Sequence, residues 1–296
     1  MIGDISSIKD QAFQYALKLV KQGARDAEKR YLIENEGMIR QALRSPSEVV
    51  SVLAVPDEAR SLQQICLEKK VPLYSIRPGI LQKLVGTGYE TGVTSIAVVG
   101  QRLLSPESLI SEGNARKRSE ANSAEPEVDS NASEESNSGS QLFLAGESIQ
   151  DPRNVGVLVR TAEAAGCAAL ILSADSADAF SRAAVRSTTG SILRLPICIV
   201  QNLPSLLHSL AETGYIIVAS SASAPSLAYD APLNRRPLCL VVGNETAGMS
   251  AAGKAAATLF VRLPMASNGA SSLNVTVAAG ALLFEAVRQG GEGNMR

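Results

Sequence analysis

The apolar residues of the first hundred positions repeat with the spacing of helices in some stretches and of strands in others. Asp10–Arg25 and Asn35–Leu43 repeat apolar side chains every three or four residues, which predicts helices. Further helices are predicted over Ala59–Lys69 and Pro78–Val85, and compact apolar runs predict strands over Val49–Val55, Val71–Ser75 and Thr94–Gly100. This alternation of strands and helices predicts a small α/β domain.

The same alternation is plainer after residue 140. Strands are predicted over Gln141–Gly146, Ala168–Ser173, Tyr215–Ser220, Leu238–Val242 and Leu259–Arg262, and helices over Asn154–Ala165, Ser181–Thr188, Leu203–Thr213 and Asn274–Gln289. We therefore expect an open, mainly parallel sheet, whose ligands bind beyond the carboxyl ends of its strands.

Between these halves lies Ser111–Ser140, a stretch rich in Ser, Asn, Glu and Gly that carries three basic and seven acidic residues. Such a segment has too little apolar surface to offset its ordering entropy, so we predict a disordered linker. The predicted organisation is thus a first domain over residues 1–110, an acidic linker over 111–140 and a second domain over 141–296.

Composition narrows the possible chemistry. The net charge of −1 allows the chain to bind phosphate groups but does not by itself indicate that it does. Only 4% of the residues are aromatic, so stacking on bases is not expected to dominate any contact with a nucleic acid. Four widely spaced Cys in apolar contexts indicate buried free thiols, and a single His leaves no His-pair metal site. The first ten residues lack a secretion signal and no apolar run approaches about 18 residues, so we expect a cytoplasmic protein without membrane contact.

Three segments of the second half carry candidate chemistry. The first, DPRNVGVLVRTA, is a polar loop that opens a helix, with Asn154 near its start and Arg160 in an apolar stretch. A buried Arg must find a partner or a ligand, whereas an exposed helical Arg needs neither, and the segment alone leaves both open.

The second segment, LCLVVGNETAGMS, runs from a buried strand into a turn. Glu245 lies where the strand ends, and Gly243 and Gly248 permit close approach of a ligand to the backbone. An ordinary turn before a helix is the alternative. The overlapping run from Gly248 to Lys254 matches a phosphate loop, but Ala255 stands where a magnesium-binding Ser or Thr is needed, so a nucleotide hydrolase is disfavoured.

The third segment, LPMASNGASSLNVTVA, joins a strand to the last helix through small residues. Ser272 and Asn274 open that helix, where either could serve simply as a cap. The loop is uncharged and rich in backbone donors, which suits an adenine and a sulfonium.

In this order the three segments resemble the signature motifs of the SpoU/TrmH family of RNA 2′-O-ribose methyltransferases, within the SPOUT superfamily. The resemblance covers about residues 141–289, and residues 29–100 more faintly resemble the family's RNA-binding domain. It implies a C-terminal domain with a trefoil knot, a homodimer, an RNA substrate (rRNA or tRNA) and S-adenosylmethionine as cofactor.

The resemblance also implies roles for individual residues. Arg160 would orient the ribose hydroxyl and stabilise its developing charge, because arginine rarely deprotonates. Glu245 and Asn154 would hold Arg160 and the substrate in place. The implied catalytic cluster is Asn154, Arg160, Glu245, Ser272 and Asn274; the implied cofactor pocket is Gly243, Asn244, Gly248, Leu263, Met265 and Leu273; no metal is needed, because the sulfonium is already activated.

Two rivals share this fold. A catalytically silent RNA-binding protein is disfavoured by the intact Asn154, Arg160, Glu245 and Asn274, which it would be free to lose. A base methyltransferase would share the knot but not this set of residues. In the first domain Arg25, Lys29, Arg30 and Arg40 are candidate phosphate contacts, although the sequence favours a solvated helix face for each of them.

Overall fold

The computed structural model describes residues 2–85, 92–122, 142–222, 225–228, 230–234, 236–266, 269 and 272–290. Its contacts divide the chain into two compact units. The first comprises Met1–Arg102, Val155–Arg160 and Asp178–Arg194, and the second comprises Leu103–Asn154, Thr161–Ala177 and Leu195–Arg296.

The first unit is built on a mixed sheet with the strand order β1-β4-β3-β5-β2. Strands β1, β4 and β3 run parallel, and β5 pairs antiparallel with both β3 and β2. Its strands are β1 (Ile2–Ile5), β2 (Arg30–Glu34), β3 (Val49–Ala54), β4 (Leu73–Ile76) and β5 (Ser95–Gly100), and its helices are α1 (Gln11–Lys18), α2 (Gln22–Glu28), α3 (Glu36–Arg44), α4 (Pro56–Glu68), α5 (Pro78–Val85) and α8 (Arg182–Ser187). Buried Phe13, Leu53, Ile76 and Val98 belong to its core.

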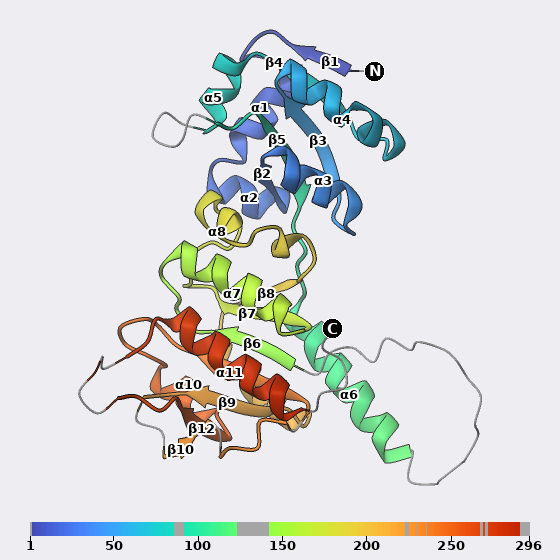
Figure 1. Cartoon of the computed structure of the whole chain (residues 1–296). Coiled ribbons are helices and arrows are strands. Elements are labelled where there is room, and N and C mark those ends of the chain that lie inside the picture. The colour runs from blue at the N-terminus through green and yellow to red at the C-terminus, as the bar shows by residue number, and fades with distance from the viewer. Residues whose placement is uncertain are drawn as a thin grey trace. The chain divides into compact units, whose positions relative to one another are not determined.

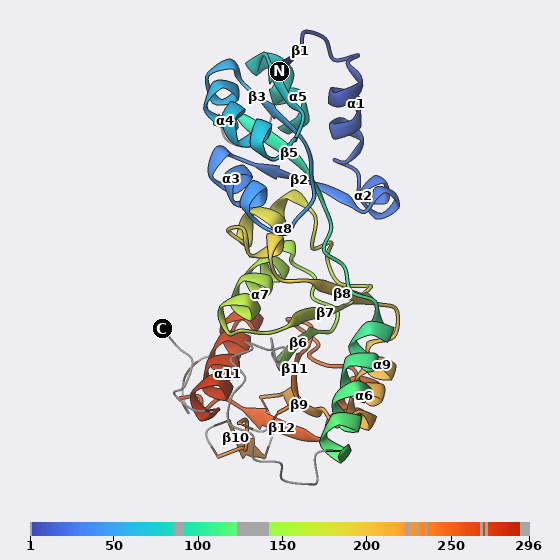
Figure 2. The same cartoon turned by 90° about the vertical axis from the view of Figure 1, so that its right-hand side faces the viewer.

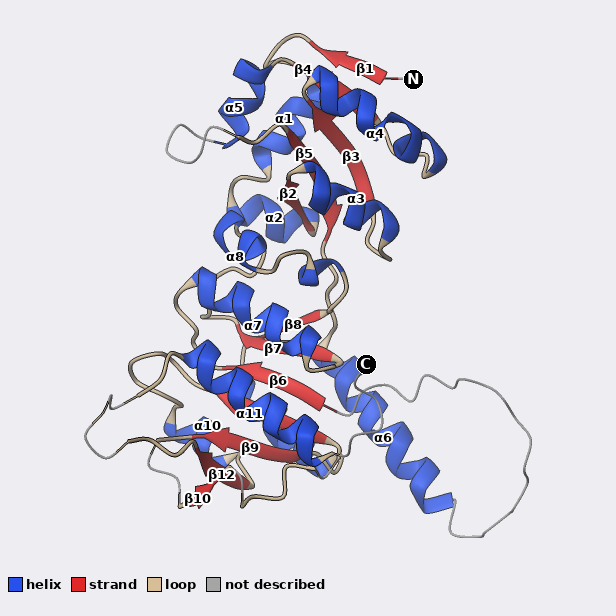
Figure 3. Ribbon diagram, viewed as in Figure 1, coloured by secondary structure: helices blue, strands red, loops and turns tan. Residues whose placement is uncertain are grey.

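The second unit is built on a parallel sheet in the order β10-β12-β9-β11-β6-β7-β8, as the sequence predicts (Figures 1 and 3). Its strands are β6 (Leu142–Gly146), β7 (Ala169–Ser173), β8 (Ile197–Val200), β9 (Ile216–Ser220), β10 (Ser226–Leu227), β11 (Leu238–Val242) and β12 (Leu259–Arg262). Every residue of β6, β7 and β11 is buried, which is why these strands read as unbroken apolar runs.

Helices cover both faces of this sheet. Figure 2 shows α6 (Pro106–Asn122) and α9 (Leu203–Glu212) on one face, and α7 (Pro152–Ala164) and α11 (Val275–Gln289) on the other. The other helices of the described residues are the short α10 (Ala251–Ala255) and a 3-10 turn (Ser191–Leu193). The α/β architecture with a parallel C-terminal sheet is confirmed; the trefoil knot stays a prediction.

Helix α6 extends to Asn122, inside the segment predicted as a linker. Pro106 begins this helix, Leu109 is buried in the core of the second unit, and a side chain at Gly113 would meet Thr213 of the α9 C-terminus. Local packing therefore holds residues that composition alone assigns to disorder. The rest of the predicted linker, from residue 123, lies outside the described residues, where its disorder stays a prediction.

The boundaries of the two units also differ from the predicted division at residue 110. Asp178–Arg194 clusters with the N-terminal residues because charged pairs join them. Arg25 donates to Asp178 at 2.5 Å, and Arg182 donates to Glu34 at 3.1 Å. The sequence contains no signal for these pairings, which join residues about 150 positions apart.

Candidate active site

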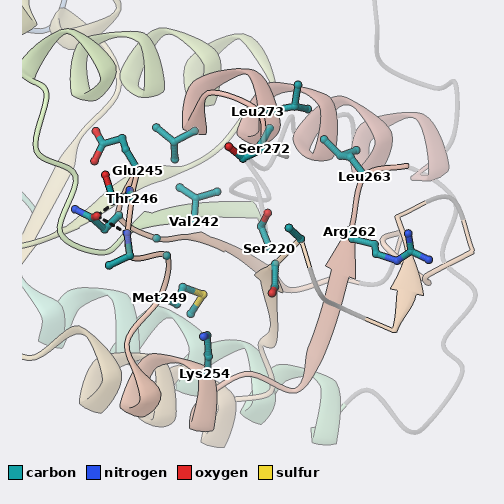
Figure 4. A pocket seen from close by; sticks show the side chains of 18 of the residues that line it. Ser220, Val242, Glu245, Thr246, Met249, Lys254, Arg262, Leu263, Ser272 and Leu273 are labelled. Atoms are coloured by element: carbon teal, nitrogen blue, oxygen red, sulfur yellow. Dashed lines mark hydrogen bonds between the residues drawn. The ribbon is translucent and has the colours of Figure 1, made fainter. Parts of the chain in front are cut away.

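The carboxyl ends of β6 and β11 lie side by side in the second unit, since Val242 pairs with Gly146. The loops that follow β9, β11 and β12, together with the start of α11, enclose a pocket of about 310 Å³ (Figure 4). This is the edge of the sheet where the sequence predicts a ligand, and the volume falls in the range of small-molecule sites.

The turn after β11 is closed by its own backbone. Asn244 and Gly248 exchange backbone hydrogen bonds of 3.1 and 2.9 Å, and Gly248 has a φ of +69°, a conformation that favours glycine. A Cβ at Gly243 would lie under 3.0 Å from backbone atoms of Gly248 and Met249. Glycine at 243 is thus required by the turn itself.

Asn244 fixes this turn to the loop after β6. Its Oδ1 accepts hydrogen bonds from the backbone N–H groups of Thr246 and Ala247, and its Nδ2 donates to the Ser148 carbonyl at 2.8 Å. Glu147 makes a second connection, because its buried carboxylate accepts from both the backbone N–H and the hydroxyl of Ser250.

Glu245 projects from the turn onto the first turn of α7. Its carboxylate accepts hydrogen bonds from the backbone N–H groups of Gln150 and Asp151 at 3.1 and 3.3 Å, and from Asn154 Nδ2 at 2.9 Å. Burial opposes ionisation, but these donors outweigh it, so the pKa of Glu245 lies below its usual value. Glu245 is therefore a carboxylate at neutral pH and acts as an acceptor.

Asn274 extends this network to the third loop. Its Oδ1 caps α11 by accepting from Thr276 N at 2.8 Å, and its Nδ2 donates to Asn154 Oδ1 at 3.4 Å. Asn274 therefore caps α11, as the sequence allowed, and it also contacts Asn154, as expected for members of one cluster. A chain of hydrogen bonds thus runs from Glu245 through Asn154 to Asn274.

The residues predicted to bind the cofactor all line the one pocket at these loops. Met265 and Leu273 are about two-fifths exposed and line the same pocket, so together they offer apolar surface to a ligand. The predicted residues that line the pocket are Gly243, Asn244, Gly248, Leu263, Met265 and Leu273, together with the predicted catalytic residues Glu245 and Ser272.

Comparisons with known proteins show the family of this chain. The SpoU rRNA Methylase family matches residues 141–284. A Bacillus subtilis protein, 23S rRNA (guanosine(2553)-2′-O)-methyltransferase RlmP, is 30% identical over 280 residues, which cover 95% of this chain and 97% of that protein.

The chain belongs to the SpoU methylase family.

Two further similarities bear on this SpoU methylase. A Nitrosomonas europaea 23S rRNA (guanosine-2′-O-)-methyltransferase, RlmB, is 37% identical over 148 residues, covering 50% of this chain and 56% of that protein. The crystal structure of an AdoMet-bound rRNA methyltransferase from Sinorhizobium meliloti shares the fold across 97% of this chain and 98% of its own, with a TM-score of 0.76 and 20% identity.

The predicted family, the S-adenosylmethionine-dependent RNA 2′-O-methyltransferase activity and the cofactor are thereby confirmed. The catalytically silent alternative gains no support. Among the described residues, no group of three or more His, Cys, Asp and Glu could hold a metal, and no helix is long and apolar enough to span a membrane.

Arg160 is the predicted catalytic residue that belongs to the first unit. It lies on α7, six positions after Asn154, and its Nη1 donates to Thr189 Oγ1 at 3.3 Å. Its catalytic role stays a prediction.

Several pocket residues escape the sequence reasoning. Ser220 stands at the end of a predicted strand, so the carboxyl-end rule could have found it. Lys254, which produced the apparent phosphate-loop match, lies in this same pocket. The other lining residues without a prediction are Ser221, Ala222, Val242, Thr246, Ala247, Met249, Arg262, Val275 and Ala278.

The structure also tests the expectations for Arg25 and for the four Cys. Arg25 is wrong both as a phosphate contact and as a solvated side chain, because it is buried and donates to Asp178 and to the carbonyls of Leu19 and Val20. All four Cys are free and buried, as predicted, and burial raises the pKa of the Cys198 thiol to about 11.

Proposed function

We propose that this chain methylates the ribose 2′-hydroxyl of a guanosine in 23S ribosomal RNA. The observation that carries the proposal is the hydrogen-bonded chain Glu245–Asn154–Asn274 on the loops that line the pocket. The choice of RNA rests on the relative RlmP, whose similarity runs over 95% of this chain.

The pocket fits S-adenosylmethionine. Leu263, Met265 and Leu273 supply apolar surface for the adenine, and the cradle at Gly243 has no room for a Cβ. Lys254 and Arg262 add two cations that suit the carboxylate of the amino acid part. When bound, the cofactor supplies a methyl group activated by its sulfonium.

The chain's own residues then act on the substrate hydroxyl. A ribose hydroxyl is a weak acid, so its oxygen must be oriented and its developing charge stabilised. Arg160 performs this role with its guanidinium. Asn154, held by Glu245 and Asn274, positions the substrate with its amide, and Ser272 completes the site as a hydrogen-bonding group on the third loop.

The proposed enzyme is a homodimer that works in the cytoplasm, where its RNA substrate is. Val277 and Phe284 on α11 are 54% and 44% exposed and lie two helical turns apart, so they form one apolar stripe. A second copy that covers this stripe would bury it. The proposal is checked by light scattering of the wild type and Phe284→Asp, which should give dimer and monomer masses.

The first experiment measures transfer of labelled methyl from S-adenosylmethionine to 23S rRNA that lacks the modification. Nuclease digestion should release labelled 2′-O-methylguanosine. A labelled methyl on a base, or no transfer to any RNA tested, would contradict the proposal.

The role of Arg160 is tested with the variant Arg160→Ala. This variant should abolish methyl transfer while leaving the affinity for the cofactor within about twofold, because Arg160 acts on the hydroxyl. Unchanged transfer would exclude its role.

A further inference from the structure

A second pocket, entirely within the first unit, is lined by arginines. It has a volume of about 330 Å³ and lies between β2, α3 and α8, of which α8 packs against β2 (Figure 1). Its polar lining includes Glu34, Gln41, Arg182, Arg186 and Thr189. None of the residues considered for the methyl-transfer reaction lines it.

Arginines outnumber carboxylates among the described side chains that line this pocket. The buried carboxylate of Glu34 is shared by two guanidinium groups, at 3.1 Å from Arg182 Nη2 and 3.9 Å from Arg186 Nη1. Two further arginines donate to other lining residues, Arg194 to Gln41 Oε1 and Arg160 to Thr189 Oγ1, both at 3.3 Å. The carboxylate of Glu34 thus orients Arg182 and Arg186, the two arginines among the described lining residues.

The backbone at the edges of the pocket is held in uncommon conformations. Asn35 and Thr189, which both line it, have φ angles of 71° and 51°, and such values are rare for a β-branched residue. Gly190 follows with φ 94°, and a Cβ there would collide with Gln41. Strain of this kind persists where the surroundings enforce it, and it is frequent at ligand sites.

From this geometry we infer that the pocket binds a phosphodiester of the RNA substrate, next to the nucleotide that is methylated. Guanidinium groups bind phosphate through paired N–H donors, and none of the described lining residues has an aromatic ring on which a base could stack. The ligand is therefore the RNA backbone and not a base. The inference rests on the proposed function, because it takes RNA to be the substrate.

The pocket is linked to the proposed chemistry through Thr189. This residue lines the pocket and also accepts a hydrogen bond from Arg160, the residue proposed to hold the ribose hydroxyl. An RNA strand that presents a ribose to Arg160 would thus pass the pocket with its neighbouring phosphates.

Arg186 is the residue on which to test the inference. Its side chain is 39% exposed and lies farther from Glu34 than that of Arg182, so its removal leaves the buried carboxylate with a partner. Arg60 on α4 is a matched control, because it is an exposed arginine (73%) paired with an acid on its own helix and lies outside the pocket.

The experiment measures the binding of an unmodified 23S rRNA transcript to the full-length protein over a series of salt concentrations. Each phosphate contact contributes about 0.7 to 0.9 to the slope of log K against log salt. Arg186→Ala should reduce this slope by about that amount, while Arg60→Ala and the charge-preserving Arg186→Lys should keep it. Cofactor affinity and melting temperature should match those of the wild type, which shows that the variant is folded.

Two results would overturn the inference. One is a folded Arg186→Ala variant with the wild-type slope. The other is binding of inorganic phosphate that is lost in Arg186→Ala but does not compete with the RNA at constant ionic strength, which would assign the pocket to a free anion. Failure of the proposed function would give a different result. The wild type would then form no 2′-O-methylguanosine, whatever the salt dependence of RNA binding by Arg186→Ala.

Discussion

The carboxylate of Glu245 accepts a hydrogen bond of 2.9 Å from the amide of Asn154, although 91 positions separate the two residues. This bond joins the turn after β11 to the first turn of α7. It also fixes the orientation of the Asn154 amide, whose Oδ1 is then turned to Asn274. One acidic side chain thereby aligns all three predicted motifs.

Replacing that carboxylate should impair the reaction more than the binding of the cofactor. Glu245→Gln loses acceptors for Gln150, Asp151 and Asn154, so the Asn154 amide, which we propose positions the substrate, is released. We expect kcat to fall about 100-fold, the usual effect of misplacing a catalytic group by about 1 Å. Single-turnover methyl transfer and calorimetric titration of S-adenosylmethionine separate the two effects. The exposed acid Glu212, changed to Gln, serves as the control and should retain full activity.

The pH dependence of stability should report the same hydrogen bonds. Because the pKa of Glu245 is lowered on folding, its contribution to stability is complete above the unfolded pKa of about 4.3 and is lost as pH falls through the folded pKa. Melting temperatures of the wild type and Glu245→Gln should therefore differ by a constant amount from pH 5 to 8 and converge in acid. A difference that grows as the pH falls would contradict the assigned direction.

The turn after β11 should not accept a side chain at its first residue. In Gly243→Ala the new Cβ would meet backbone atoms of Gly248 and Met249, which cannot move aside as a flexible side chain can. Overpacking of this kind costs about 1–3 kcal/mol, so the Kd for S-adenosylmethionine should rise about 10- to 100-fold in calorimetric titrations. Gly23→Ala is the control, because nothing lies within 4 Å of its Cβ and it is helical. Its affinity should be that of the wild type.

Lys254 should recognise the carboxylate of the cofactor. A hydrogen bond to a charged group is worth about 1.5–3 kcal/mol, so Lys254→Ala should weaken S-adenosylmethionine binding about 10- to 100-fold. Binding of 5′-methylthioadenosine, which has no carboxylate, should be unchanged in the same variant. Equal weakening of both ligands would show that Lys254 only shapes the pocket.

Local pattern suffices where a strand is a compact apolar run in the sequence. Leu238–Val242 and Leu259–Arg262 were predicted with the bounds that the structure has, since each is an apolar run that ends at a Gly or Pro-marked loop. Strand β2 is not predicted, because its apolar run Tyr31–Ile33 is short and lies between charged residues. The strand forms through antiparallel pairing with β5. The single helix predicted over Asp10–Arg25 is instead α1 and α2, separated where Arg25 donates to the Leu19 and Val20 carbonyls.

The sequence by itself determined the family and the type of reaction, because the order and residue types of the three motifs are sufficient to indicate both. Only the tertiary structure decided which side chains meet. Glu245 meets Asn154, Lys254 lines the proposed cofactor pocket, and Glu34 meets Arg182 and Arg186. The physical reason is the range of the interactions. Helix and strand periodicity depend on neighbours a few positions away, whereas these contacts depend on how a sheet or unit brings together residues about 90 to 150 positions apart.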